Sequence, residues 1–307
     1  MLCGLPGSGK STYAKTKVSS GYSVYSSDDL RIEMFGDVNC QGNNEKLFTE
    51  LHRRIKQALK NGKNIIYDAT NINKKQRMHF IRQLKNIECY KECMIFPLPI
   101  GYCIDNNLSR EKAVPISVID KMVKTFAVPY YDEGFDIISI KEPEFDSDVV
   151  DLCEFVNMMC EITQDNPNHD FTIGEHCLRT YQYIKENIKD REDLQWAALL
   201  HDCGKVYCKS FKDRNGNTTN IAHYYGHENV SAYISIQILL KYYATDDLLR
   251  IVHLINNHMR FMQIASMDSD AAKNAECKLI DKFGLDVVND LYTLYVADKT
   301  SAKEVML

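Results

Sequence analysis

The sequence predicts an α/β domain, a parallel sheet wrapped by helices, over residues 1–145, followed by an all-α domain over residues 146–307. Strand-like runs alternate with helical stretches up to about Lys141, and no strand pattern recurs after Val149. Such alternation indicates a parallel sheet, because each parallel strand needs a crossover connection before the next one. Between the two parts lies an acidic, proline-containing stretch that has the composition of a linker.

The expected elements follow from local runs of strand-forming residues and from helical periodicity. The first strand is short, since only three residues precede Gly4, where about five or six are usual. The strands are Met1–Cys3, Tyr22–Ser26, Asn64–Tyr67, Cys89–Phe96 and Asp136–Ile140. The helices of the first domain are Lys10–Ser20, Glu45–Asn61, Lys74–Lys85, Ile100–Ser109 and Ile116–Phe126. Those of the second domain are Val149–Ile162, Thr172–Asn187, Asp193–Asp202, Gly226–Tyr243, Asp246–His258, Ala271–Phe283 and Val287–Lys299.

The composition is that of a soluble globular protein and excludes disordered and fibrous classes, with 45% hydrophobic and 26% charged residues. The net charge of −5 means that any nucleic-acid binding must come from a local basic groove. The 11 cysteines contain no C-x-x-C pair, which indicates reduced thiols. Since no apolar stretch approaches about 20 residues and no signal-peptide pattern is present, we expect a cytoplasmic protein without membrane contact.

A phosphate-binding loop occupies the start of the chain. The residues from Gly4 to Ser11 match G-x-x-x-x-G-K-[ST] at every fixed position, between a short apolar strand and a helix. Backbone N–H groups of such a loop surround the β-phosphate, Lys10 reaches the β and γ oxygens, and the Ser11 hydroxyl ligates Mg²⁺. The alternative without a binding function is a glycine-rich turn that happens to precede a helix. The residues expected to bind ATP with Mg²⁺ are Gly4, Gly7, Ser8, Gly9, Lys10, Ser11 and Thr12.

Carboxylates follow two other predicted strands, and ligands of open parallel sheets collect at that edge. Asp28 would take the proton from an attacking hydroxyl, while Arg31, three residues on, would hold a phosphate of the acceptor. Asp28 and its neighbour Asp29 have an alternative role at a helix N-terminus, and Asp68 as a strand-end turn residue.

Arg110 lies in a polar segment between two helices and would close over the γ-phosphate as part of a lid. The alternative is a solvated surface arginine. The basic run from Lys74 to Arg77 would follow the backbone of a nucleic-acid acceptor, or would simply be a solvated helix face.

These patterns together resemble the 5′-hydroxyl polynucleotide kinases of phage and bacterial nucleic-acid repair. The matching segments are Gly4–Thr12, Ser27-Asp-Asp-Leu-Arg31, Asp68-Ala-Thr-Asn71, and Arg110 before Ala113-Val-Pro115. The resemblance implies a P-loop kinase domain in which Asp28 is the general base and Arg31 binds the phosphate of the terminal nucleotide. It also implies that Arg110 is the lid arginine and that Asp68 supports the acceptor site.

A second chemistry is indicated by the doublet His201-Asp202, which ends an apolar helical run just before Gly204-Lys205. Two ionisable residues at the end of a buried helix are costly unless a cation organises them. Other helices offer one His or Asp each near one end, namely His176, His227, His258 and Asp298. Such mixed donors suit Mn²⁺, Ni²⁺, Co²⁺, Fe²⁺ or Zn²⁺ better than Mg²⁺.

This set resembles the HD-domain phosphohydrolase superfamily, from about His169 to the end of the sequence. Its four core ligands match His176, His201, Asp202 and Asp298, and the added histidines of its two-metal branch match His227 and His258. The resemblance implies one or two divalent ions with Asp202 between them, and Lys205 neutralising the oxygens of the attacked phosphate. His169, His223 and His253 are expected not to be ligands.

A 5′-hydroxyl kinase joined to a metal phosphohydrolase predicts an enzyme that heals the two ends of one broken strand. It would phosphorylate 5′-hydroxyl ends and remove 3′- or 2′,3′-cyclic phosphates, with RNA favoured over DNA and a ligase acting afterwards. One alternative is a nucleoside or nucleotide kinase joined to a nucleotidase or phosphodiesterase. Another is a non-catalytic nucleotide sensor, which the intact Lys10, Asp28 and His201-Asp202 disfavour.

Overall fold

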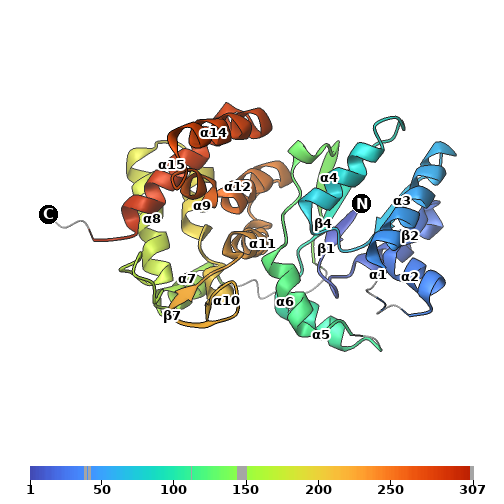
Figure 1. Cartoon of the computed structure of the whole chain (residues 1–307), viewed down its shortest axis with the longest axis horizontal. Helices are drawn as coiled ribbons and strands as arrows, with labels where there is room; N and C mark the ends of the chain where they lie inside the picture. Colours follow the sequence, from blue (N-terminus) through green and yellow to red (C-terminus); the bar gives the residue numbers. More distant parts are fainter. Residues whose placement is uncertain (38–39, 41–42, 112, 144–150, 305–307) are drawn as a thin grey trace. The chain divides into compact units, whose positions relative to one another are not determined.

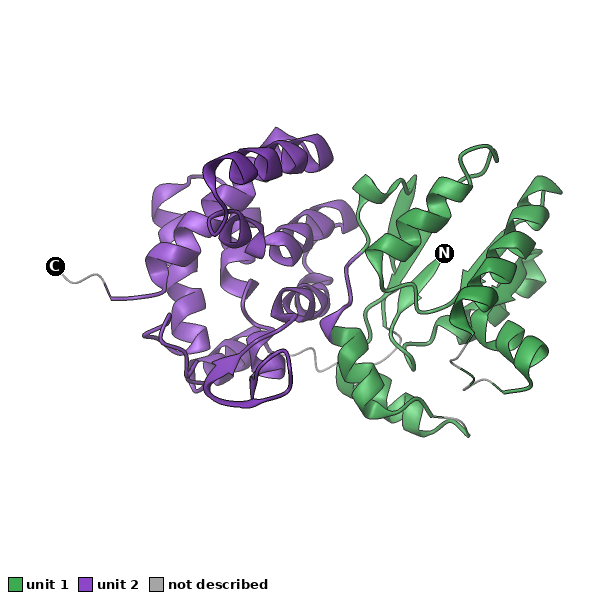
Figure 2. Ribbon diagram, in the orientation of Figure 1, with its two compact units in different colours: residues 1–123, 129–144 green, residues 124–128, 145–307 purple. Residues whose placement is uncertain are grey.

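The computed structural model describes residues 1–37, 40, 43–111, 113–143 and 151–304. The chain divides into two compact units, which are described separately (Figure 2). Unit 1 comprises Met1–Val123 and Pro129–Glu144, and unit 2 comprises Lys124–Val128 and Phe145–Leu307. The predicted domain boundary between residues 145 and 146 lies outside the described residues.

Unit 1 is built on parallel strands (Figure 1). β2 (Ser23–Ser26) pairs with β3 (Ile65–Asp68), and β1 (Leu2–Gly4), β4 (Glu92–Phe96) and β5 (Ile137–Ile140) pair in the order β1-β4-β5. In register, Leu2 lies opposite Met94 and Glu92 lies opposite Ile137. All five predicted strands of this unit are therefore present.

The two groups of strands are joined beside β1. The Gly4 N–H donates to the Thr70 carbonyl (3.0 Å), and Asn71 Nδ2 donates to the Leu2 carbonyl (2.8 Å). Asn71 makes this bridge from a left-handed backbone conformation, with φ of 48°, which asparagine tolerates better than most residues. The carboxyl ends of β1 and β3 are thus held together where the phosphate loop begins.

Helices flank these strands (Figure 1). They are α1 (Lys10–Thr16), α2 (Ser27–Phe35), α3 (Asn44–Lys60), α4 (Lys74–Gln83), α5 (Ile100–Leu108) and α6 (Ile116–Lys124), with short 3-10 turns η1 (Val18–Ser20) and η2 (Tyr131–Glu133). The buried face of α3 presents Leu47, Leu51 and Ile55, spaced one helical turn apart. They share a core with Tyr67 of β3 and Phe80 of α4. This packing fixes the end of β3, and with it Asp68.

A buried ion pair joins α4 to η2. Arg77 Nε and Nη2 donate to the two carboxylate oxygens of Glu133 (2.7 and 2.6 Å), and both side chains are fully buried. Arg77 Nη1 also donates to the Asn71 carbonyl (2.8 Å), and Lys74 pairs with Asp132 (2.7 Å). The expectation that Lys74 and Arg77 follow a nucleic-acid backbone is therefore wrong for Arg77, because its guanidinium is sealed in the core.

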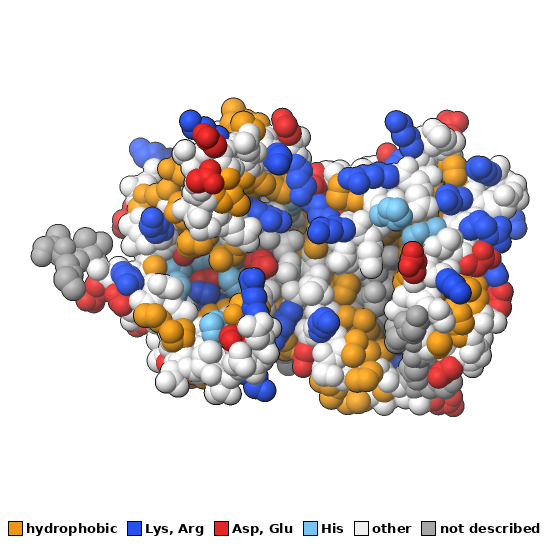
Figure 3. All heavy atoms as spheres, in the orientation of Figure 1, with side chains coloured by type: hydrophobic (Ala, Val, Ile, Leu, Met, Phe, Trp, Pro, Cys, Tyr) orange, Lys and Arg blue, Asp and Glu red, His pale blue; other side chains and the backbone are white. Residues whose placement is uncertain are grey.

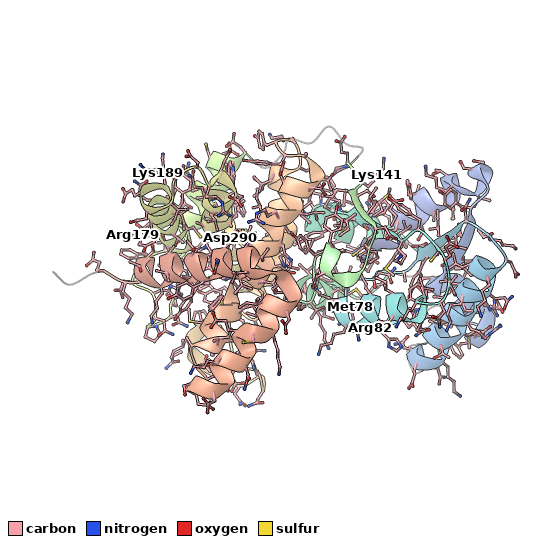
Figure 4. All side chains as sticks on the ribbon, turned by 90° about the horizontal axis from the view of Figure 1, so that it is seen from above. Met78, Arg82, Lys141, Arg179, Lys189 and Asp290 are labelled. Carbon is pink, nitrogen blue, oxygen red and sulfur yellow. The ribbon has the colours of Figure 1, made fainter. Side chains whose placement is uncertain are left out.

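Unit 2 is mainly helical. Its elements are α7 (Leu152–Cys160), α8 (Ile173–Asn187), α9 (Glu192–Leu200), α10 (Lys205–Cys208), β6 (Ser210–Lys212), β7 (Thr218–His223), α11 (His227–Leu239), α12 (Thr245–Asn257), α13 (Met259–Ile264), α14 (Ser269–Phe283) and α15 (Leu285–Ser301). Asp290 of α15 accepts hydrogen bonds from Arg191 (2.7 Å) and Arg250, which ties α15 to α12 and to the start of α9 (Figure 4). The predicted fold class is confirmed, and the elements not predicted include the antiparallel hairpin β6–β7 and the helices α2, α10 and α13. Within the described residues, no helix is long and apolar enough to span a bilayer.

We predict that Glu133→Gln destabilises unit 1 by about 3–5 kcal/mol, because it leaves the Arg77 charge buried without a counter-ion. The free energy of unfolding from urea titrations followed by circular dichroism measures this. The control is Arg53→Ala, which removes an exposed pair with Glu50 (2.7 Å; side chain of Arg53 65% exposed) and should destabilise the protein far less. Equal losses in the free energy of unfolding for the two variants would show that the buried ion pair stabilises the protein no more than the exposed one.

Candidate functional site

The phosphate loop has the backbone that its sequence predicts. Gly7 and Gly9 have φ values of 82° and 90°, and a side chain at Gly7 would place a Cβ 2.2 Å from the Cys103 carbonyl oxygen. α1 begins directly after the loop, so its free N–H groups face the space that the loop encloses. Lys10 Nζ folds back to donate to the Leu5 carbonyl (2.6 Å) and to Ser8 Oγ (3.2 Å).

Asp68 joins the phosphate loop at the end of β3. Its side chain is buried, is hydrogen-bonded to the Ser11 side chain and lies close to Lys10. Burial raises the pKa of Asp68, opposed by Ser11 and Lys10 and reinforced by the carboxylates of Asp28 and Asp29. A hydroxyl and a carboxylate side by side are the oxygen ligands that hold Mg²⁺ beside nucleotide phosphates. The geometry thus connects Asp68 with the nucleotide side of the site, in addition to the acceptor role expected from the sequence.

The acceptor side is formed by α2. Ser26 is the N-cap of this helix and accepts from the Asp29 N–H (3.2 Å), so neither Asp28 nor Asp29 is needed as the cap. Both aspartates are exposed in the first turn. Arg31 is buried, and its Nη1 donates to the Cys40 carbonyl (2.7 Å) and to Asn44 Oδ1 (2.8 Å). The role of Arg31 in phosphate binding stays a prediction. A phosphate would have to bind the guanidinium beside these two partners or replace one of them.

Arg110 is exposed, just after α5, and its charge acts on Lys10. Burial lowers the pKa of the Lys10 ammonium to about 8, with a small further contribution from Arg110, against the raising effect of Asp68. Arg110 therefore lies within electrostatic range of the phosphate loop, as a lid arginine must.

Unit 2 brings the predicted metal ligands together. Two sets of side chains have donor atoms within 4.8 Å of one another: His176, His201, Asp202 and Asp298, and Asp202, His227 and His258. All six residues are buried. Histidine, acidic and basic side chains are visible together in a hollow on the face of this unit (Figure 3).

Asp202 belongs to both sets, and it offers a different oxygen to each. Its Oδ2 lies 3.4 Å from His176 Nε2 and 3.3 Å from His201 Nε2. Its Oδ1 lies 3.1 Å from His227 Nε2 and 3.7 Å from His258 Nε2. This is the arrangement of a carboxylate that bridges two cations.

Backbone carbonyls orient the imidazoles. Nδ1 of His201, His227 and His258 lies 2.8, 2.8 and 2.7 Å from the carbonyl oxygens of Ala198, Tyr224 and Ile255, respectively. Since a carbonyl only accepts, Nδ1 carries the proton and the lone pair of Nε2 points inward. Facing Nε2 atoms are 3.2 Å apart for His176 and His201, and 3.3 Å apart for His227 and His258. Lone pairs so close repel unless a proton or a cation lies between them, so the residues fit divalent transition metals.

The charges of the two sets differ. Burial opposes protonation of His201, but the carboxylates of Asp202 and Asp298 outweigh it and raise its pKa to about 10. In the second set, burial and the neighbouring imidazoles of His201 and His227 lower the pKa of His258 to about 3. Without a metal, the first set therefore carries an additional proton at neutral pH, whereas His258 is neutral with its single ring proton on Nδ1.

Lys205 stands beside Asp202, with two partners that the sequence did not single out. Its Nζ lies 2.6 Å from Asp202 Oδ2, donates to Gln164 Oε1 (2.7 Å) and is 3.4 Å from His169 Nε2. Gln164 is almost completely buried, although it lies in a loop between α7 and α8. These contacts occupy the three N–H groups of Lys205, so the ammonium must give up its longest contact, that to His169, to meet a phosphate oxygen. His169, His223 and His253 lie outside both ligand sets.

Comparisons with known proteins agree with this division. Residues 1–129 match the family model of the AAA domain, and residues 173–303 match that of the HD domain. The L-seryl-tRNA(Sec) kinase of Methanococcus maripaludis is 25% identical over 219 residues, which cover 69% of this chain and 84% of that protein. Transcription factor bHLH140 of Arabidopsis thaliana is 27% identical over 155 residues, which cover 48% of this chain but only 16% of the plant protein. A P-loop kinase-like domain is thus followed here by an HD domain.

We predict that the shared carboxylate makes the two ligand sets unequal in their response to mutation. His258→Ala should lose one of two bound ions, whereas Asp202→Ala should lose or strongly weaken both. Metal content after dialysis against Mn²⁺, measured by inductively coupled plasma mass spectrometry, tests this. His79→Ala, which removes an exposed histidine of unit 1, is the control. Retention of two ions by Asp202→Ala would contradict the bridging arrangement.

Metal binding should release protons, and its affinity should rise with pH. His201 has a pKa raised to about 10, so its proton is present below that pH and must leave when a cation binds. The apparent affinity should increase about tenfold per pH unit between roughly pH 6 and 9 for each proton displaced. Calorimetric titrations with Mn²⁺ in buffers of different ionisation enthalpy count these protons. An affinity independent of pH over this range would contradict the assignment.

Proposed function

We propose that this chain heals nucleic-acid ends, by ATP-dependent phosphorylation of 5′-hydroxyl ends and metal-dependent removal of 3′- or 2′,3′-cyclic phosphates. RNA ends are the favoured substrate, and a ligase would act on the healed ends. The observation that carries the proposal is the presence, in one chain, of a complete phosphate loop with Asp28 and Asp68 at its edge and a metal cage built around Asp202.

The kinase step needs a base, a positive charge and a bound nucleotide. Asp28 is exposed in the first turn of α2, near Asp68, where it can accept the proton of an attacking hydroxyl. Lys10 and Arg110 would neutralise the charge that develops on the transferred phosphoryl group. Ser11 and Asp68 would hold Mg²⁺ between the phosphates.

The hydrolytic step belongs to unit 2. Divalent ions bound there would activate water and polarise the phosphate, and Mn²⁺, Ni²⁺, Co²⁺, Fe²⁺ and Zn²⁺ all suit these donors. His176, His201 and Asp298 would hold one ion, His227 and His258 the other, and Asp202 both. Lys205 Nζ lies beside Asp202 and would donate a hydrogen bond to an oxygen of the attacked phosphate after releasing His169.

A second candidate concerns the acceptor of the kinase. The alignment with L-seryl-tRNA(Sec) kinase covers 84% of that protein, whose name gives a serine carried on tRNA as its substrate. An RNA-linked serine hydroxyl would meet the same base and phosphate loop as a ribose 5′-hydroxyl. Under this candidate the RNA remains the substrate class, but the phosphorylated group changes. A nucleoside or nucleotide acceptor is the small-molecule alternative.

The test follows each end of one oligonucleotide separately. A single-stranded RNA with a 5′-hydroxyl and a 2′,3′-cyclic phosphate is incubated with ATP, Mg²⁺ and Mn²⁺, and products are separated by electrophoresis and mass. Lys10→Ala should reduce 5′ phosphorylation by about 100-fold or more and spare the 3′ end, because it removes a charge at the phosphoryl group only. Asp202→Ala should do the reverse.

Parallel reactions with seryl-tRNA and with nucleosides identify the acceptor. Phosphate transfer to seryl-tRNA alone would select the second candidate. An unmutated protein that changes neither end of the oligonucleotide would overturn the end-healing proposal.

A further inference from the structure

The hairpin β6–β7 lies in sequence between Lys205 and His227, and the hydrolytic chemistry above does not use it. Alternate residues of β7 face opposite sides. Ala222 is fully buried, whereas Ile221 on the other side is 42% exposed. Tyr225, which follows the strand, is 39% exposed, and Phe211 of β6 is 42% exposed. The hairpin and the residues that follow it therefore expose two aromatic side chains, of which Tyr225 stacks on His223.

The exposed Tyr225 ring stacks on the half-buried ring of His223 and is accompanied by positive charge. The rings of His223 and Tyr225 are nearly parallel, 9° apart, with centroids 5.3 Å from each other, and the Tyr225 hydroxyl lies 3.2 Å from His223 Nδ1. The Arg214 guanidinium lies 5.2 Å from the centre of the Tyr225 ring. Lys212 is exposed on β6, and Asp213, the acidic residue of the turn, is engaged by the N–H groups of Asn215 and Asn217.

The hairpin is firmly attached to the wall of the metal cage. The Ala222 N–H donates to the Asp165 carbonyl (2.9 Å), and Lys209 Nζ pairs with the Asp165 carboxylate (2.7 Å). The Tyr224 hydroxyl donates to the carbonyl of Gln164, the residue whose side chain holds Lys205. A platform attached in this way keeps its distance from the metal ligands.

Tyr225 is close in sequence to one of the metal ligands. Tyr225 precedes the ligand His227 by two residues, so their Cα atoms are at most about 7 Å apart. The backbone of the same segment also orients that ligand, since His227 Nδ1 lies 2.8 Å from the Tyr224 carbonyl oxygen. The backbone that carries Tyr225 is therefore continuous with the backbone that carries a metal ligand.

We propose that the surface of the β6–β7 hairpin formed by Arg214, His223 and Tyr225 is a binding track for the single-stranded oligonucleotide whose terminal phosphate enters the metal cage. A base stacks on Tyr225, and Arg214 with Lys212 meets the adjoining backbone phosphates, as in proteins that bind single strands without sequence preference. The inference rests on the proposed function and deepens it, because it makes the substrate of the HD domain a strand end and not a free nucleotide. Because the net charge of −5 does not attract nucleic acid to the chain as a whole, RNA binding depends on this local basic and aromatic surface.

Binding and hydrolysis are measured separately. Binding uses fluorescence anisotropy of a labelled single-stranded RNA with a 5′-phosphate and a 3′-hydroxyl, without ATP, so that neither end can react. Hydrolysis compares the same RNA carrying a 3′-phosphate with glycerol 2-phosphate, which has no ring to stack. Both are carried out on the full chain with Mn²⁺.

Tyr225→Ala should weaken RNA binding, and raise KM for the 3′-phosphorylated RNA, by about five- to 150-fold, with hydrolysis of glycerol 2-phosphate unchanged. Arg214→Ala should weaken binding less and reduce its salt dependence by the equivalent of about one phosphate contact. Tyr225→Phe should retain binding, because stacking needs the ring and not the hydroxyl. The matched control is Tyr242→Ala, which removes another exposed tyrosine of unit 2 with a lysine over its ring.

RNA binding by Tyr225→Ala equal to that of the unmutated chain would overturn the inference. So would an equal loss for Tyr225→Phe, or an equal loss in binding of a mononucleotide, which would indicate a small-molecule site. The two proposals can fail separately. If the unmutated chain removes no 3′-phosphate, the proposed function is contradicted, and weaker RNA binding by Tyr225→Ala would still support the binding track.

Discussion

Unit 2 is organised around the cost of burying one carboxylate among imidazoles. Asp202 is almost inaccessible to solvent, and each of its oxygens faces a different pair of histidines. Such a cluster is unfavourable without compensating charge, and the compensation present in the chain is the ammonium of Lys205, 2.6 Å away. Backbone carbonyls then fix the rings from outside, so the donors are in place before any cation arrives. One residue thereby determines how far apart two cations would lie.

Unit 1 handles phosphate by different physical means. Its loop relies on backbone N–H groups and on glycine conformations that side chains cannot adopt, as the 2.2 Å approach of a Cβ at Gly7 to the Cys103 carbonyl shows. Lys10 and Asp68 bring opposite charges to the same edge of the sheet. The two units therefore combine chemistries of opposite direction, one suited to adding a phosphoryl group and the other to removing one.

Much of this was predictable because the signals are local. Fixed glycine spacing predicts the phosphate loop, and runs of a few residues predict the strands of unit 1 and its helices other than α2. The six predicted metal ligands lie close together in the structure. For Asp298, the sequence signal was only its position near the end of a predicted helix. The structural role of Arg77 was not predictable, since its partner Glu133 is far away in the chain. The hairpin β6–β7 was missed because its strands are short and polar, despite the turn signal Asn215-Gly216. Gln164 gave no signal, because its importance arises only from contact with Lys205.

The place of Asp298 on α15 has a consequence for biosynthesis. This helix follows the other ligand-bearing helices in the chain, and it supplies both a carboxylate for His176 (3.0 Å) and the Ser301 carbonyl beside the same ring. A ribosome-bound chain that has not yet released α15 lacks this side of the cage, so it cannot capture a stray cation with full affinity. Binding of a metal ion at full affinity would therefore wait until α15 has been translated. A chain that terminates before α15 lacks the Asp298 carboxylate and the Ser301 carbonyl.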